Sequence, residues 1–145
     1  MDGGGERAAE PGWRSDQGVM PAMVIVKIDT RRITSWEAFH AVFQEAFGFP
    51  GFYGRNMNAW IDCMSSLDDP GAGMTTIHVQ PGEVLVLQLG HVNEFSKRCP
   101  EQYTALIEDA AFVNWRRIEV GENAVLALSF FKGVALLNTS GCRHV

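Results

Sequence analysis

The sequence predicts an α/β fold in which a small three-stranded parallel sheet packs against helices, an order of elements typical of layered α/β domains. Three runs of the sequence have the length and apolar content of strands, and segments with helical periodicity separate them. The second and third runs are almost continuously apolar, which is typical of parallel strands covered on both faces. With 145 residues, of which 46% are hydrophobic, the chain is long enough to form one core.

The first half of the predicted domain consists of a strand and two helices. The strand covers residues 23–28, MVIVKI. A Thr-Ser pair at 34–35 can cap a helix whose apolar residues recur at three- and four-residue steps, and Gly48 ends that helix. Asn56 is a suitable cap for a second helix, which we expect to end near Ser66.

The second half of the predicted domain contains the other two strands and further helices. Apolar runs at residues 83–89 and 124–131 predict the strands. From Glu94 the sequence favours a helix with a break at residues 99–100, Cys-Pro, and a stronger helix follows the break. We expect residues 115–120 to fray or turn before the last strand.

Three segments lie outside the regular pattern. Residues 1–22 are rich in Gly, Pro and polar groups without an apolar period, which predicts a flexible N-terminal extension. Residues 132–145 are expected to form a C-terminal tail. Residues 67–82 are rich in turn residues and long for a connection, so they form either a binding loop or an irregular insertion. The core is thus expected within one domain, residues 23–131.

The charge of the chain is acidic, and the excess lies in the domain. The whole sequence has 12 basic and 17 acidic residues, a formal net charge of -5, and residues 23–131 alone carry that same net charge. This balance argues against general nucleic-acid binding and favours a basic protein partner. No stretch approaches the ~20 consecutive apolar residues that a spanning helix requires, so no membrane partner is expected.

The cysteines and histidines indicate neither a disulfide framework nor a metal site. The sequence has an odd number of cysteines, three, at positions Cys63, Cys99 and Cys142. Its four histidines lack the close pairing that zinc ligands usually show. The opening of the chain carries charges where a secretory signal would have its apolar run. We therefore expect a cytoplasmic protein that holds no cofactor and no metal.

The second predicted helix has one face for the core and another that is presented to solvent or to a partner. The core face contains Met57, Trp60, Met64 and Leu67. The presented face has a carboxylate at its centre and contains Asn58, Ile61, Asp62 and Ser65. Phe52, Tyr53 and Gly54 lie just before this helix. On a surface helix considered by itself, an aspartate such as Asp62 is more often simply solvated than part of a binding site.

No set of residues converges on a catalytic site. Cys63 lies beside Asp62 and one step from the core face, which favours a buried structural cysteine over a nucleophile. Asp62 could form an acid/base dyad with Asp68, Asp69 or Glu108, but no spacing requires it. We expect that the protein is not an enzyme, and a small hydrolase that uses Asp62 or Cys63 is the alternative.

Residues 47–64, FGFPGFYGRNMNAWIDCM, resemble the most characteristic segment of the barstar family of intracellular ribonuclease inhibitors. The shared features are a helix end, a loop with Pro, an aromatic pair followed by Gly, and a helix that carries Asp-Cys. The resemblance extends more loosely over residues 23–131. It implies a barstar-like α/β fold and an inhibitor of the immunity or antitoxin type, which blocks the active site of a basic ribonuclease or related toxin in a one-to-one complex.

The resemblance also implies which residues bind the partner. Asp62 matches the family's central acidic residue, whose carboxylate occupies the phosphate site of the enzyme and accepts charge-assisted hydrogen bonds from cations there. Asn56 and Gly54 match the start of the binding helix and the turn of the loop. An acidic contact from the last helix falls on Glu108 or Asp109. The expected partner-binding residues are Asp62, Asn58, Ile61, Phe52, Tyr53, Gly54, Asn56 and Ser65.

Four positions depart from the family pattern. Phe52 lacks the hydroxyl of the tyrosine that is common there, Asn58 and Arg55 replace acidic residues, and Ile61 replaces a tryptophan. Fewer carboxylates make the binding face less anionic, so we expect a different cognate toxin. The alternative function is a non-inhibitory protein-interaction module with the same fold, which would use Phe52, Trp60 and Ile61 as an apolar patch.

Overall fold

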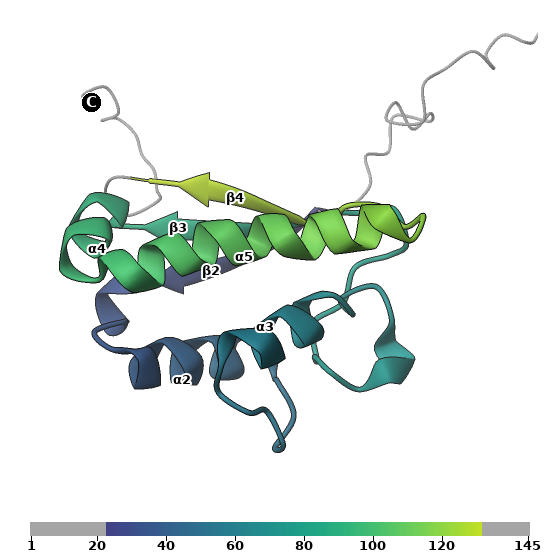
Figure 1. The fold of residues 1–145 in the computed structure, drawn as a ribbon, viewed down its shortest axis with the longest axis horizontal. Helices are drawn as coiled ribbons and strands as arrows, with labels where there is room; N and C mark the ends of the chain where they lie inside the picture. The colour runs from purple at the N-terminus through teal and green to yellow at the C-terminus, as the bar shows by residue number, and fades with distance from the viewer. Residues whose placement is uncertain (1–22, 132–145) are drawn as a thin grey trace, which may run out of the picture.

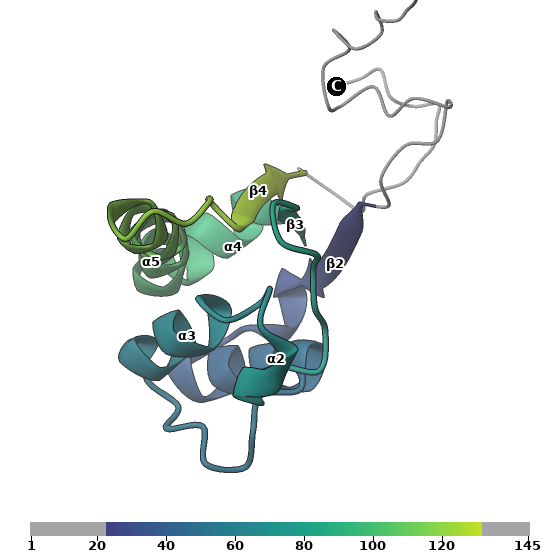
Figure 2. The ribbon, with the colours of Figure 1, turned by 90° about the vertical axis from the view of Figure 1, so that its right-hand side faces the viewer.

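The computed structural model describes residues 23–131 and shows a parallel sheet with the helices on one side of it (Figures 1 and 2). The strands are β2 (Val24–Asp29), β3 (Leu85–Gly90) and β4 (Leu126–Phe130). The helices are α2 (Trp36–Phe47), α3 (Met57–Met64), α4 (Val92–Arg98) and α5 (Pro100–Glu119), with short 3-10 helices η2 (Thr30–Arg32) and η3 (Pro70–Ala72). The predicted α/β class is confirmed, and the predictions for residues 1–22 and 132–145 lie outside the described residues.

The sheet has the order β2-β3-β4, and both strand pairs are parallel. Val24 is opposite Leu85, which in turn is opposite Leu126. Burial alternates along the strands, since Val26 and Ile28 are buried whereas Ile25 is 46% exposed. The prediction that both faces of the sheet are covered is therefore wrong for the described residues. Helices pack on one face only, and the strand residues of the other face remain partly exposed.

Helix α2 begins and ends at the residues that the sequence indicates. The Ser35 hydroxyl oxygen accepts a hydrogen bond from the backbone N–H of Ala38 at 3.1 Å, which satisfies one free donor at the helix start. Gly48 ends the helix in the left-handed conformation, with φ of 67°. The side chains that α2 buries in the core are Phe39, His40, Val42, Phe43 and Phe47.

Helix α3 is short and well anchored at its start. The Asn56 side-chain oxygen accepts from the backbone N–H of Ala59 at 2.8 Å. Trp60 and Met64 are fully buried, as is Leu67 beyond the end of the helix, so the predicted core face is confirmed. The helix ends at Met64, slightly earlier than expected, and the backbone of residues 67–82 then forms an irregular loop. That loop is tied back by bonds from Val79 N–H to the Leu67 carbonyl and from Thr76 N–H to the Phe47 carbonyl.

Helix α5 follows α4 directly at the Cys99-Pro100 junction and runs without interruption to Glu119. The prediction that residues 115–120 fray or turn is therefore wrong for residues 115–119, which are helical, and confirmed for Val120, where the turn towards β4 begins. The reason lies partly in Asn114, whose side-chain oxygen accepts from the backbone N–H groups of Val125 and Leu126 at 2.9 and 3.0 Å. Its amide group also donates to the Leu126 carbonyl at 2.9 Å, so the last turns of α5 are held against the start of β4.

Candidate functional site

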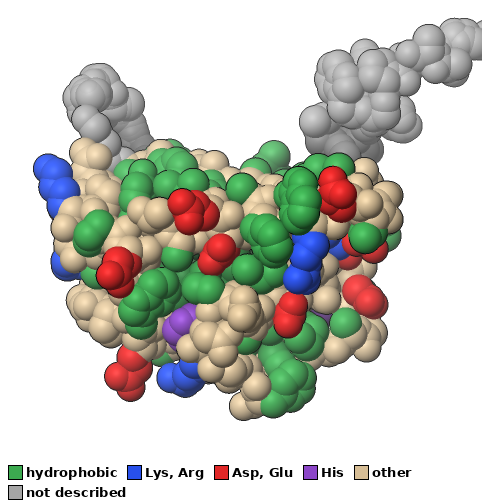
Figure 3. Space-filling model, in the orientation of Figure 1, with side chains coloured by type: hydrophobic (Ala, Val, Ile, Leu, Met, Phe, Trp, Pro, Cys, Tyr) green, Lys and Arg blue, Asp and Glu red, His purple; other side chains and the backbone are tan. Residues whose placement is uncertain are grey.

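The candidate site is the exposed face of α3 together with the part of α5 that lies beside it (Figures 1 and 2). The Asp62 side chain is 60% exposed, Asn58 is exposed, and Ser65 is half-buried. On the molecular face that presents α3 and α5, acidic side chains alternate with hydrophobic ones (Figure 3). The sequence prediction that Asp62 and Asn58 are presented to solvent is confirmed.

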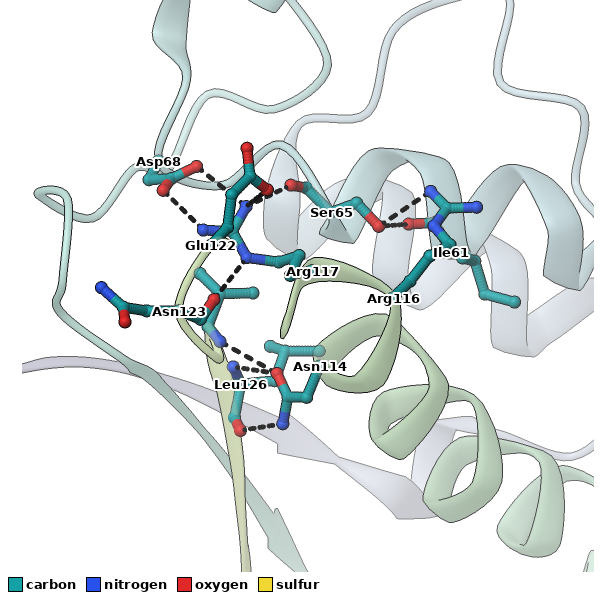
Figure 4. Close-up of polar contacts among 10 residues, drawn as sticks. Ile61, Ser65, Asp68, Asn114, Arg116, Arg117, Glu122, Asn123 and Leu126 are labelled. Atoms are coloured by element: carbon teal, nitrogen blue, oxygen red, sulfur yellow. Dashed lines mark hydrogen bonds and ion pairs between the residues drawn. The ribbon is translucent and has the colours of Figure 1, made fainter. Parts of the chain in front are cut away.

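Arg116 of α5 is the basic side chain that contacts this face. Its guanidinium lies 3.3 Å from the Asp62 carboxylate and donates to the Ser65 hydroxyl at 3.1 Å, as Figure 4 shows for Ser65. It also lies over the ring of Phe112, 6.0 Å from the ring centre. Sequence reasoning did not find this residue, because nothing in the local pattern relates a position on α5 to one on α3.

Arg117, the next residue, is buried and joins the end of α3 to the end of α5 (Figure 4). Its guanidinium donates to the Ser65 carbonyl at 2.8 Å, to the Asp68 carboxylate at 2.7 Å and to the Asn123 carbonyl at 2.7 Å. Sequence reasoning missed it too. A signal was present, since Arg117 continues the buried helical stripe of Leu106, Ala110 and Val113, and an arginine in such a stripe needs buried acceptors.

The loop before α3 places its two aromatic residues in opposite environments. Phe52 is 75% exposed, whereas Tyr53 is only 6% exposed and packs on Phe49 with ring centres 4.7 Å apart. The Tyr53 hydroxyl and Nδ1 of His40 form a buried hydrogen bond. Burial raises the pKa of the Tyr53 hydroxyl well above its usual range, so it stays protonated. The expectation that Tyr53 is presented to a partner is therefore wrong, and its role is to hold the loop.

The turn between this loop and α3 uses an unusual backbone conformation. Gly54 is exposed, and Arg55 has a φ of 55°, in the left-handed region. The Arg55 guanidinium donates to the Gln44 side-chain oxygen of α2 at 3.1 Å, which ties the turn to the rest of the molecule. Asn56, also exposed, then caps α3. The turn thereby determines where α3 begins and where its exposed face points.

Ile61 does not lie on the presented face, because its exposed fraction is only 7%. Helix α3 packs against the core on one side and against α5 on another, which buries two faces of the helix instead of one. Trp60 is also buried, so the predicted apolar patch of Phe52, Trp60 and Ile61 is not formed. Of these three side chains, the structure exposes only Phe52.

Cys63 is 2% exposed, in agreement with a structural cysteine. Burial, and then the charge of Asp62, raise the pKa of its thiol to about 11. The thiol is therefore protonated at neutral pH, and the geometry gives no support to its use as a nucleophile.

Glu108 and Asp109 of α5 are the acidic residues that the resemblance assigns to a partner contact from the last helix. Glu108 is exposed, and Asp109 is half-buried with a pKa that burial and then Glu108 raise. Asp109 lies seven residues before Arg116, a separation of about 10 Å along the helix axis. Both remain predicted partner contacts, and the α5 side chain that pairs with Asp62 is the cation of Arg116. Among residues 23–131, no cluster of His, Cys, Asp and Glu is arranged to hold a metal ion, and no helix is long and apolar enough to span a membrane.

Comparison with protein families gives one result for this chain. A family model described as barstar (barnase inhibitor) matches residues 23–126, which is most of the described domain and includes the whole candidate site. A comparison with individual curated proteins gives no match.

Proposed function

The chain belongs to the barstar family, and from this premise we propose that it is a protein inhibitor that binds a basic ribonuclease and blocks its active site. The proposal includes a role of the immunity or antitoxin type, in which the inhibitor forms a one-to-one complex with a ribonuclease or related toxin in the cytoplasm. The inhibitor itself catalyses no reaction. Its partner-binding residues would be Asp62, Asn58, Ser65, Phe52, Gly54 and Asn56. The buried side chains of Tyr53 and Ile61 would hold the loop and α3 in place.

The observation that carries this proposal is the exposed carboxylate of Asp62 on an α3 that is rigidly held. A carboxylate can replace the phosphate oxygens of a substrate, because it accepts charge-assisted hydrogen bonds from the same Arg, Lys or His side chains. The Asn56 cap and the buried Trp60 fix α3 before the partner arrives. Little conformational entropy is then lost on binding, which favours a tight complex.

The surroundings of Asp62 also fit a protein partner. Asn58 lies one helical turn before Asp62 and is exposed, and Phe52 offers a large exposed apolar ring in the loop that precedes α3. Protein interfaces usually combine large apolar side chains with polar groups, and Phe52 and Asn58 supply one of each. The domain's net charge of -5 would in addition speed its encounter with a basic enzyme.

The direct test compares Asp62→Ala with Glu94→Ala, which removes the same charge from an exposed site on α4. Each variant and the wild type are used as bait against a panel of small basic ribonucleases, and nuclease activity is measured on what is retained. We expect Asp62→Ala to weaken binding by about 100-fold, as truncation of a central interface residue does. Barstar itself is a known example of a protein whose binding depends strongly on one central interface residue. Equal binding by wild type and Asp62→Ala would contradict the proposal.

A second candidate function, an interaction module without inhibitory activity, is favoured by another surface. Large apolar side chains are exposed along the end of α5 and just beyond it: Phe112 at 40%, Trp115 at 54%, Ile118 at 57% and Val120 at 71%. Exposed apolar groups gathered in this way often mark a contact site. If the protein self-associates in sedimentation experiments, if Trp115→Ser abolishes that association, and if no ribonuclease is inhibited, the second function is the better one.

A further inference from the structure

We propose that Arg116 is a specificity-determining residue, which competes with the partner's cation for the Asp62 carboxylate. The inference rests on the proposed function and concerns the choice of partner. It predicts that the protein discriminates against ribonucleases whose phosphate site presents only cations. The ribonuclease that fits best also places a carboxylate within reach of the Arg116 guanidinium.

The first step of the argument is that Asp62 already has a counter-ion in the free protein. The guanidinium of Arg116 lies 3.3 Å from its carboxylate, and the two side chains are 43% and 60% exposed. An ion pair with this exposure stabilises little, because water competes with both partners. A cation of the ribonuclease can therefore reach Asp62 and share its carboxylate without a large cost for breaking the pair.

The second step is that Arg116 stays near Asp62 when the partner binds. The guanidinium has two other contacts, the Ser65 hydroxyl at 3.1 Å and the ring of Phe112 at 6.0 Å. The backbone beneath it is also fixed, since Arg117 is buried and bonded to the Ser65 carbonyl and to Asp68. The positive charge of Arg116 is thus held at the place where the partner's cation must approach.

The third step is the consequence of two cations around one carboxylate. As the interface forms, water leaves and the effective dielectric constant falls, so the repulsion between the two cations grows. A carboxylate on the partner removes this repulsion, and guanidinium–carboxylate pairs are favourable because they can form two parallel hydrogen bonds. Asp62 and Arg116 together therefore select a partner surface that presents one cation and one anion side by side.

The test uses barnase, the ribonuclease in the family's description, as the probe. Arg116→Met removes the charge and keeps an unbranched side chain over Phe112. Its matched control is Arg31→Met, which removes the same charge from η2, where Arg31 pairs with Asp29. Affinity and association rate are measured for the wild type, for both variants and for Arg116→Met combined with Asp62→Ala. We expect Arg116→Met to bind barnase about tenfold more tightly than the wild type, as the loss of one nearby like charge predicts.

Three results would decide the matter. A gain for Arg116→Met that Arg31→Met does not share, and that Asp62→Ala removes, supports the inference. Inhibition of barnase by the wild type through Asp62, with no gain for Arg116→Met or an equal gain for Arg31→Met, overturns the inference and leaves the proposed function intact. If no variant binds barnase, Arg116→Met included, the inference is also overturned, and the ribonuclease panel described above decides the function separately.

Discussion

Arg116 and Arg117 are consecutive residues of α5 whose side chains are 43% and 5% exposed. Arg117 is the one on which stability depends. Arg117→Met would leave the Asp68 carboxylate and two carbonyl groups without their buried donor, and we expect a loss of about 3 kcal/mol in the free energy of unfolding. Arg116→Met should cost less than about 0.5 kcal/mol, because its ion pair is exposed.

Urea unfolding of both arginine variants measures this difference. Both substitutions remove one charge and introduce the same side chain, so each is a control for the other. Equal losses of stability would contradict the assignment of Arg117 as the structural residue and Arg116 as the surface one.

A single residue, His40, also predicts how the stability of the protein depends on pH. Burial first, and then the charge of Arg55, lower its pKa from the ordinary value of 6.5. The folded state therefore binds a proton less readily than the unfolded state, and stability falls as the pH is lowered through and below 6.5. Unfolding measured between roughly pH 7.5 and pH 5.5 should show this fall. In His40→Gln the free energy of unfolding should depend less steeply on pH over that interval. An unchanged dependence would show that another group is responsible.

Among the elements, the end of α2 provides the clearest test, because it depends on one glycine. Gly48 has a φ of 67°, and an added Cβ would collide with the side chain of Thr76. Gly48→Ala should destabilise the protein by about 2 kcal/mol, through backbone strain and the displacement of Thr76. Gly51→Ala is the control, since an added Cβ there would meet no heavy atom within 4 Å other than those of Gly51 and its two neighbours in the chain. Thermal unfolding of the two variants compares them, and equal midpoints would contradict this account.

The elements also show what the sequence could predict about the fold. Ser35, Gly48 and Asn56 end or begin helices at the predicted places, because capping depends on residues that are adjacent in sequence. Residues 115–119 behave differently from the prediction, since the contacts that keep them helical come from Asn114 to β4 and from Arg117 to α3. Those contacts span 12 and 52 positions of the sequence, beyond the three- and four-residue steps of a helical pattern, so no local pattern reveals them.

The candidate site also combines features that the sequence predicts with features that only tertiary contacts determine. The exposure of Asp62 and the burial of Trp60 follow from helical periodicity. The burial of Ile61 does not, because it requires knowing that α5 packs beside α3. Tyr53 is a similar case, since the sequence favours a place at the partner surface, whereas its hydroxyl bonds with His40 on α2. The contact between Arg116 and Asp62 spans 54 residues and needs the three-dimensional structure.

For the molecule as a whole, the net charge of -5 predicts how association depends on salt. A basic ribonuclease should be attracted over a distance set by the Debye length, which is about 10 Å at 0.1 M salt. We expect the association rate to fall about tenfold or more when salt is raised from about 0.05 to 0.5 M, while dissociation changes less. Stopped-flow measurements with the retained nuclease test this, and a rate independent of salt would contradict a charge-steered encounter.

The parallel sheet has a further consequence for how the chain folds. Val24 pairs with Leu85, which is 61 positions later, and Leu85 pairs with Leu126, which is 41 positions later. No strand pair of the described sheet is joined by a short hairpin, so each pairing must close a long loop. Such a topology slows folding, and the central strand β3 cannot be paired on both edges until β4 has left the ribosome. A newly made chain would therefore complete this core only after the residues of β4 have emerged.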